Sequence, residues 1–66
     1  MQLKQHLRIM QYVSQHGSAS VSDIATLLNV PPRIAYKRLT LLTQQRLLSL
    51  SYTKRGERAI AIYRAP

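Results

Sequence analysis

The chain has 66 residues, 45% of them hydrophobic, so we expect a single small domain over residues 1–66. Ten Lys and Arg residues against two acidic residues give a formal net charge of +8, which indicates a polyanionic partner. The lack of cysteine and the scarcity of carboxylates exclude disulfides, zinc–thiolate sites and paired-carboxylate catalysis.

The first predicted helix covers Gln2–His16. Apolar residues recur along it at helical spacing and predict its buried face: Leu3, Leu7, Met10 and Val13. Ile9 widens that face. Gly17 follows the helix and suits a left-handed C-terminal cap.

A second helix is predicted to begin after Ser20, because Ser20 and Asp23 form a capping-box pattern. Its buried face consists of Ile24, Leu27 and Leu28. The NVPP run at residues 29–32 then breaks the chain.

The third helix is predicted over residues 32–45, since proline is tolerated at the first helical position. Its inner face carries Ala35, Leu39 and Leu42. The opposite face is polar and basic, with Arg33, Lys37, Thr40 and Gln44, flanked by Tyr36 and Leu41.

Two strands are predicted at the C-terminal end of the chain. Residues 48–52 alternate apolar and polar, which indicates a half-buried strand, and residues 59–63 form its partner. Residues 53–57, which contain Gly56, are expected to form the turn. The tip carries Lys54, Arg55 and Arg58.

Residues 22–33, SDIATLLNVPPR, resemble the helix-turn-helix core of bacterial winged-helix regulators. The residues that follow match the usual spacing of the recognition helix and first wing strand: Ala35, Leu39, Leu42 and residues 47–48. This resemblance covers residues 7–63 and implies an α+β winged helix-turn-helix, with three helices followed by a two-stranded β-hairpin wing. The short chain, the Tyr in the third helix and the KRG run at residues 54–56 resemble the short regulators of pilus and fimbrial operons in enteric bacteria.

The predicted function is sequence-specific binding of double-stranded DNA as a transcription regulator. The helix at residues 32–45 is expected in the major groove, and the basic wing at residues 53–58 on the backbone or in the minor groove. The candidate base contacts are Arg33, Tyr36 and Lys37. The candidate backbone and wing contacts are Ser20, Ser22, Arg38, Thr40, Lys54, Arg55 and Arg58.

Two residues depart from the winged-helix pattern. Arg46 stands where related chains usually have a glycine, so it either adopts a left-handed conformation or the turn is built differently. Leu41 replaces a usual polar residue and is a possible protein contact. An alternative function is therefore a protein–protein interaction module of a larger assembly.

Other classes of function are disfavoured. The absence of Phe and Trp argues against RNA or single-strand binding, which relies on aromatic stacking. We expect no catalytic residues, no cofactor and no metal, because no nucleophile set, glycine-rich loop or ligand spacing occurs. Without a membrane span or signal peptide, the chain is expected to be cytoplasmic. It is expected to be a monomer that self-associates on DNA or pairs with a partner regulator protein.

Overall fold

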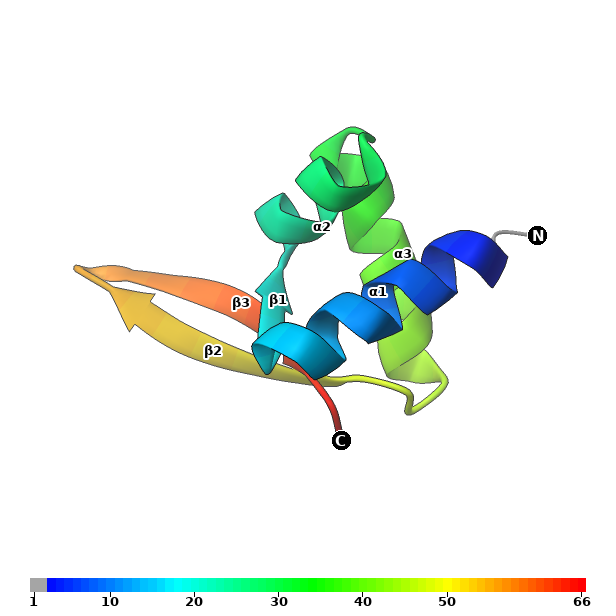
Figure 1. The fold of residues 1–66 in the computed structure, drawn as a ribbon. Helices are drawn as coiled ribbons and strands as arrows, with labels where there is room; N and C mark the ends of the chain where they lie inside the picture. The colour runs from blue at the N-terminus through cyan, green and yellow to red at the C-terminus, as the bar shows by residue number, and fades with distance from the viewer. Residues whose placement is uncertain (1–2) are drawn as a thin grey trace.

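The computed structural model describes residues 3–66, so Gln2, the predicted start of the first helix, lies outside the described residues. Six elements follow in chain order: α1 (Leu3–His16), β1 (Ser18–Ser20), α2 (Val21–Leu28), α3 (Pro32–Gln44), β2 (Ser49–Arg55) and β3 (Arg58–Arg64). The strands form one antiparallel sheet in the order β1-β3-β2 (Figure 1). This is the predicted winged helix-turn-helix order, and β1 adds a short third strand.

The core lies where the three helices meet the base of the sheet. Its buried residues come from every element except β2, together with Leu48 just before that strand: Ile9, Val13, Ala19, Ile24, Ala25, Leu28, Ala35, Leu39, Leu42, Leu48 and Tyr63. The three predicted inner residues of α3 are completely buried, so that prediction is confirmed. Burying one leucine or isoleucine side chain contributes about 1.5–3 kcal/mol. A core of this size therefore fixes how α3 is rotated.

The buried face of α1 differs from the prediction. Ile9 and Val13 are buried, whereas Leu7 is 55% exposed. Residues two apart on a helix point about 200° apart, so Leu7 and Ile9 cannot both face the core. Packing against β1 and the rest of the core buries the side of α1 that carries Ile9 and Val13. The predicted cap after this helix is confirmed, because Gly17 has a φ of +84° and its N–H donates to the Val13 carbonyl at 2.8 Å.

The helix-turn-helix is set by local caps. The Ser20 hydroxyl accepts from the Asp23 N–H at 3.1 Å, and the Asp23 carboxylate accepts from the Ser20 N–H at 3.0 Å. This confirms the capping box that starts α2. Asn29, in the left-handed conformation with φ 54°, ends α2, and Pro32 opens α3.

Arg46 adopts the left-handed conformation, with φ +62°. Its N–H donates to the Thr43 carbonyl at 3.0 Å, and the Leu47 N–H donates to the Leu42 carbonyl at 2.9 Å. This pair of bonds is a Schellman motif, and it ends α3 with an arginine where glycine is favoured. A non-glycine residue in this conformation costs about 1 kcal/mol.

The hairpin is longer and its turn tighter than the predicted turn at residues 53–57. β2 continues to Arg55 and β3 begins at Arg58, which leaves only Gly56 and Glu57 in the turn. The φ angle is positive at Gly56 (62°) but not at Glu57, which is the pattern of a type II′ turn. Such a turn follows the right-handed twist of the strands, so pairing continues to the tip.

The predicted half-buried strand is correct only at its start. Leu48 is 2% exposed, but Leu50 is 41% and Tyr52 is 66% exposed. The hairpin extends beyond the helices (Figure 1), and these two side chains line an open groove beside α3, which leaves them only partly covered. The alternating pattern in the sequence therefore marks two chemically different faces of a projecting hairpin.

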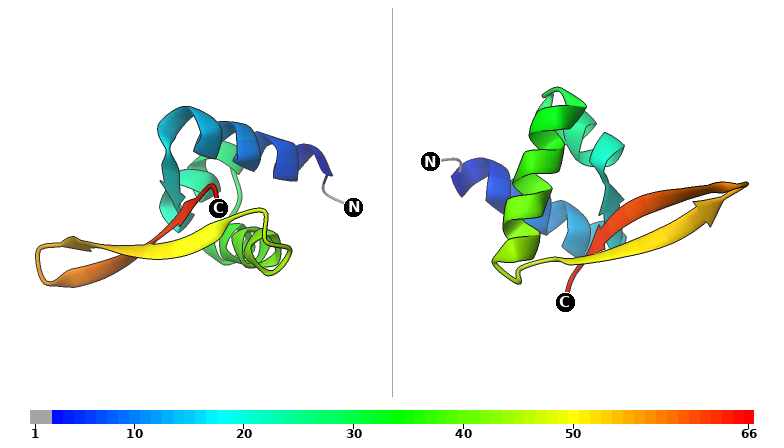
Figure 2. Two further views of the ribbon diagram at one scale, coloured as in Figure 1. Left: turned by 90° about the horizontal axis from the view of Figure 1, so that it is seen from below. Right: turned by 180° about the vertical axis from the view of Figure 1, so that it is seen from behind.

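The arrangement of the elements leaves one side of the molecule to α3 and the hairpin. Seen from below, α1 lies on one side, and α3 and the hairpin lie next to each other on the opposite side (Figure 2). No helix within residues 3–66 is long and apolar enough to cross a membrane.

Candidate nucleic-acid interface

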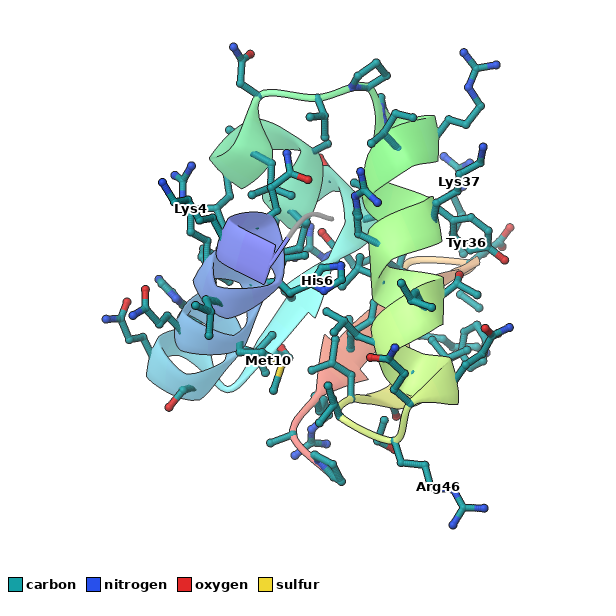
Figure 3. All side chains as sticks on the ribbon, turned by 90° about the vertical axis from the view of Figure 1, so that its right-hand side faces the viewer. Lys4, His6, Met10, Tyr36, Lys37 and Arg46 are labelled. Carbon is teal, nitrogen blue, oxygen red and sulfur yellow. The ribbon has the colours of Figure 1, made fainter. Side chains whose placement is uncertain are left out.

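The outward face of α3 presents the predicted base-contacting residues. Arg33 and Lys37 are exposed, and Tyr36 is 54% exposed. Tyr36 and Lys37 project from the side of α3 that faces away from α1 (Figure 3). Arg38 and Thr40 are half-buried, and the Arg38 Nε atom is buried without a hydrogen-bond partner. Ala35, Leu39 and Leu42 turn the inner face of α3 toward the core, so the opposite face of the helix points outward.

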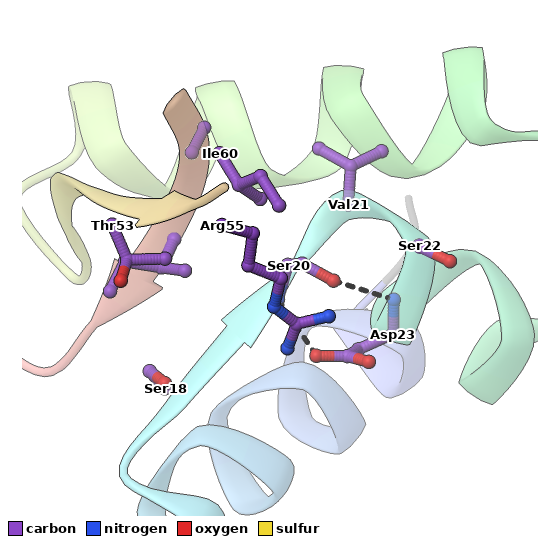
Figure 4. A pocket seen from close by; sticks show the side chains of 10 residues that line it. Ser18, Ser20, Val21, Ser22, Asp23, Thr53, Arg55 and Ile60 are labelled. Carbon is purple, nitrogen blue, oxygen red and sulfur yellow. Dashed lines mark hydrogen bonds between the residues drawn. The ribbon is translucent and has the colours of Figure 1, made fainter. Parts of the chain in front are cut away.

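The start of α2 lies beside the hairpin. Ser20 uses both its hydroxyl and its N–H in the capping box, so its N–H is not available to a ligand. Ser22 is exposed and unconstrained by that cap. Ser20, Ser22 and Asp23 line an open pocket whose opposite wall includes Arg55 of β2 (Figure 4). The Arg55 side chain extends into this pocket toward Asp23 (Figure 4).

The basic residues of the wing do not form one cluster. Successive side chains of a strand point to opposite faces, so Lys54 and Arg55 diverge. Lys54 shares its face with Tyr52, which faces α3, whereas Arg55 faces the start of α2. The wing therefore presents positive charge on two faces, rather than only at its tip as the sequence suggested.

Arg55 and Arg58 are direct cross-strand partners at the end of the hairpin. Both are exposed. Directly opposed like charges destabilise a strand pair by about 0.2–1 kcal/mol. Two arginines in this position therefore disfavour the hairpin slightly, and an anion beside them would offset that cost.

A groove runs between α3 and the hairpin, and we call it the tyrosine groove. Its walls include Tyr36 and Thr40 of α3, Leu50 and Tyr52 of β2, and Tyr63 of β3. Tyr63 is 2% exposed, and this burial raises the pKa of its phenol; the nearby Tyr36 and Tyr52 add to the shift. Sequence reasoning placed an exposed face of Leu50 in the alternative protein contact but missed Tyr52 as a surface residue. The available signal was spacing, because Leu50 and Tyr52 lie four and two residues before Lys54 and therefore share its face of the strand.

The positive charge of the chain is concentrated in residues 33–58. Seven of the ten cations lie between residues 33 and 58: Arg33, Lys37, Arg38, Arg46, Lys54, Arg55 and Arg58. On α1, by contrast, Arg8 donates to the Leu27 carbonyl at 3.0 Å and has a structural role. Within residues 3–66, no group of three His, Cys, Asp or Glu residues could hold a metal ion.

No protein-family model matches the sequence, and it has no significant match among curated proteins. Solved structures do match. Stf76 from the Sulfolobus islandicus plasmid-virus pSSVx is 15% identical, with a TM-score of 0.82 over 92% of this chain and 79% of Stf76. A transcriptional regulator homologue from Pyrococcus horikoshii OT3 is 18% identical, with a TM-score of 0.75 over 92% of this chain and 60% of that one.

A single-substitution mutant of ZitR from Lactococcus lactis, solved in complex with DNA, is 22% identical, with a TM-score of 0.73. That match covers 94% of this chain and 40% of ZitR, so the chain spans well under two thirds of the ZitR chain. At these identities the likeness shows the fold. The chain has the α+β winged helix-turn-helix fold predicted from the sequence.

Proposed function

We propose that this chain is a transcription regulator that binds double-stranded DNA at specific sequences. The observation that carries the proposal is that α3 and the hairpin lie next to each other (Figure 2) and that these two elements carry six exposed or half-buried cations: Arg33, Lys37, Arg38, Lys54, Arg55 and Arg58. ZitR, whose structure holds DNA, supports it as a protein of the same fold. The Pyrococcus protein is named as a transcriptional regulator homologue, which supports the regulatory role.

In this proposal α3 enters the major groove. A helix with its side chains is about 10–12 Å across, and the major groove is about 12 Å wide. Arg33 and Lys37 lie near the N-terminal end of α3 and are exposed, so they are assigned to guanine O6 and N7. Each such contact contributes about 1–3 kcal/mol of discrimination between bases.

Other residues are assigned to the backbone of the duplex. Ser22 at the start of α2 and Arg55 across the pocket contact one phosphate region (Figure 4). Lys54 and Arg58 contact phosphates or the minor groove through the wing. The half-buried Arg38 reaches the backbone beside α3. These contacts position the protein and are not expected to select a sequence.

A second function, as a protein-interaction module, is favoured by one observation. Leu41, in the last turn of α3, is 37% exposed, and Leu47, in the loop that follows the helix, is 45% exposed. A partner regulator protein would contact this end while the other end of α3 remains on DNA. Self-association on DNA is the other route by which one small module would reach a useful affinity.

Fluorescence anisotropy with two lysine variants tests the proposal. Lys37→Ala removes a charge from the proposed interface, and Lys4→Ala removes the same charge from α1, on the side away from α3 (Figure 3). The duplexes are the DNA upstream of the protein's own coding sequence and a scrambled copy, measured at about 50–200 mM salt. Lys37→Ala should lower affinity for the upstream duplex by about 5–150-fold, the range set by about 1–3 kcal/mol.

Lys4→Ala should change affinity for both duplexes equally and only slightly. If the two variants behave alike, the assigned face is wrong. If the wild-type chain binds both duplexes equally and with steep salt dependence, sequence specificity is refuted and charge alone drives binding. Binding to an acidic protein without binding to DNA would support the interaction module instead.

A further inference from the structure

The tyrosine groove has a chemistry that phosphate contacts do not explain. Tyr36 is 54% exposed, Tyr52 is 66% exposed and Leu50 is 41% exposed, and all three line the same groove. Exposed aromatic and aliphatic side chains contribute little to binding an anion. A contiguous apolar surface beside a cationic face indicates a ligand that is itself partly apolar.

The pairing of the hairpin explains why these side chains converge. Leu50 is the cross-strand partner of Tyr63, and Tyr52 is the partner of Ala61, so all four project from the same face of the hairpin. That face is turned toward the α3 stripe that begins at Tyr36. The groove is therefore formed jointly by α3 and the β2–β3 hairpin.

Cations border the groove, and its floor is neutral. Lys37 follows Tyr36 along α3, and Lys54 follows Tyr52 on the same face of β2, so positive charge lies at both walls. The buried Tyr63 phenol is protonated at neutral pH, as an ordinary phenol is, and burial raises its pKa further. This combination complements a polyanion that presents an apolar group between its phosphates.

Duplex DNA carries such a group in the major groove. The C5-methyl group of thymine is the apolar feature of base-pair edges there, and side chains such as alanine, threonine and aromatics recognise it by contact. Tyr36 and Thr40 supply a ring and a methyl group on the α3 wall of the groove. Both lie on the face of α3 that carries Lys37.

We propose that the tyrosine groove reads the C5-methyl group of thymine, through the Tyr36 ring and the Thr40 methyl, next to the bases contacted by Arg33 and Lys37. The inference rests on the proposed DNA binding and deepens it. It adds thymine to a recognition pattern that the cations alone would restrict to guanine.

Deoxyuridine in place of thymidine is the direct probe, because it removes only the methyl group and keeps every hydrogen bond of the base pair. Duplexes are first selected from a random-sequence pool on the full chain. The enriched duplex is then synthesised with thymine, with uracil at each thymine position, and with uracil plus 5-methylcytosine. Anisotropy titrations at one fixed salt concentration compare the three forms.

The wild-type chain should bind the thymine duplex about fourfold more tightly than the uracil duplex for each methyl group contacted, which is the factor given by about 0.8 kcal/mol per buried carbon. Tyr36→Ser should bind the two forms equally. Tyr36→Phe is the matched control, since it keeps the ring, and it should preserve the fourfold difference. Circular dichroism of each variant confirms that the exposed position leaves the fold intact.

Equal binding of the thymine and uracil duplexes by the wild-type chain would overturn the inference while DNA binding stands. A difference that survives Tyr36→Ser would also overturn it. Recovery of affinity in the 5-methylcytosine form would show that the groove does not distinguish thymine from methylated cytosine, which would overturn its assignment to thymine. A dimer detected by sedimentation and disrupted by Tyr36→Ser, with equal binding of the thymine and uracil duplexes, would show instead that the groove binds a second copy of the chain. If no duplex is enriched, the proposed function itself fails.

Discussion

Replacing Arg58 with glutamine should stabilise the free hairpin and weaken DNA binding at the same time. Arg55 and Arg58 are direct cross-strand partners next to a two-residue turn, and like charges in that position are unfavourable by about 0.2–1 kcal/mol. Glutamine keeps most of the side-chain length and removes the charge. A gain of about 0.5 kcal/mol corresponds to hairpin amides that exchange roughly twofold more slowly.

The effect on DNA has a separate magnitude. Each phosphate contact contributes about 0.9 to the slope of log affinity against log salt. Between about 50 and 200 mM, a fourfold change in salt, losing one contact makes the decline in affinity about 3.5-fold smaller. Anisotropy titrations at these two salt concentrations measure that factor, and amide exchange of the DNA-free protein measures the hairpin.

Arg64→Gln is the matched control. Arg64 also lies on β3 and is exposed, but its cross-strand partners are Ser18 and Ser49, so no like charge opposes it. Its loss should leave hairpin exchange unchanged. Faster exchange in Arg58→Gln together with an unchanged salt slope would refute the reasoning, because the two arginines would then neither repel each other nor contact phosphate.

Three further predictions concern stability and its dependence on pH. Ser20→Ala removes the capping box and should lower the free energy of unfolding by about 1 kcal/mol, or Tm by about 4–8 °C, whereas Ser22→Ala, outside the cap, should leave Tm nearly unchanged. Arg46→Gly relieves about 1 kcal/mol of left-handed strain but adds unfolded-state entropy, so thermal melting should show a net gain of about 0.5 kcal/mol; a lower Tm would contradict the Schellman assignment. Because burial raises the pKa of Tyr63, the stability it contributes is present below the ordinary value of 10.0 and is lost as the pH rises through the higher folded value. Tyr63→Phe should flatten that alkaline loss in melts at about pH 9–11, and an unchanged profile would show that another group causes it.

Recognition by a single module sets the scale of the affinities expected here. Single DNA-binding modules bury about 600–1,000 Å² of protein surface, and such contacts are weak unless a second module or a partner helps. In the proposed functions, the protein partner contacts Leu41 and Leu47, in the last turn of α3 and just after it, and DNA contacts the N-terminal part of α3 and the wing. Loss of affinity in a Leu41 variant only when the partner is present would distinguish this role from DNA contact.

The sequence by itself determined the features that depend on neighbours within about four residues. Ser20 and Asp23 mark the start of α2 because both hydrogen bonds of the cap close within three residues. The inner face of α3 follows from helical spacing, and Pro32 opens that helix, as predicted. The sequence did not decide the conformation of Arg46, because that conformation depends on the path of the chain from α3 into β2.

Only the tertiary structure decided which apolar surfaces find a partner. α1 offers two stripes, and packing against β1 chose Ile9 and left Leu7 in solvent. β1 itself has three residues and exists because β3 lies alongside it, which no local pattern reveals. Likewise Tyr52 faces α3 across an open groove, since the hairpin extends past the helices that would have covered it. Burial is a property of pairs of elements, so the spacing of residues within one element cannot fix it.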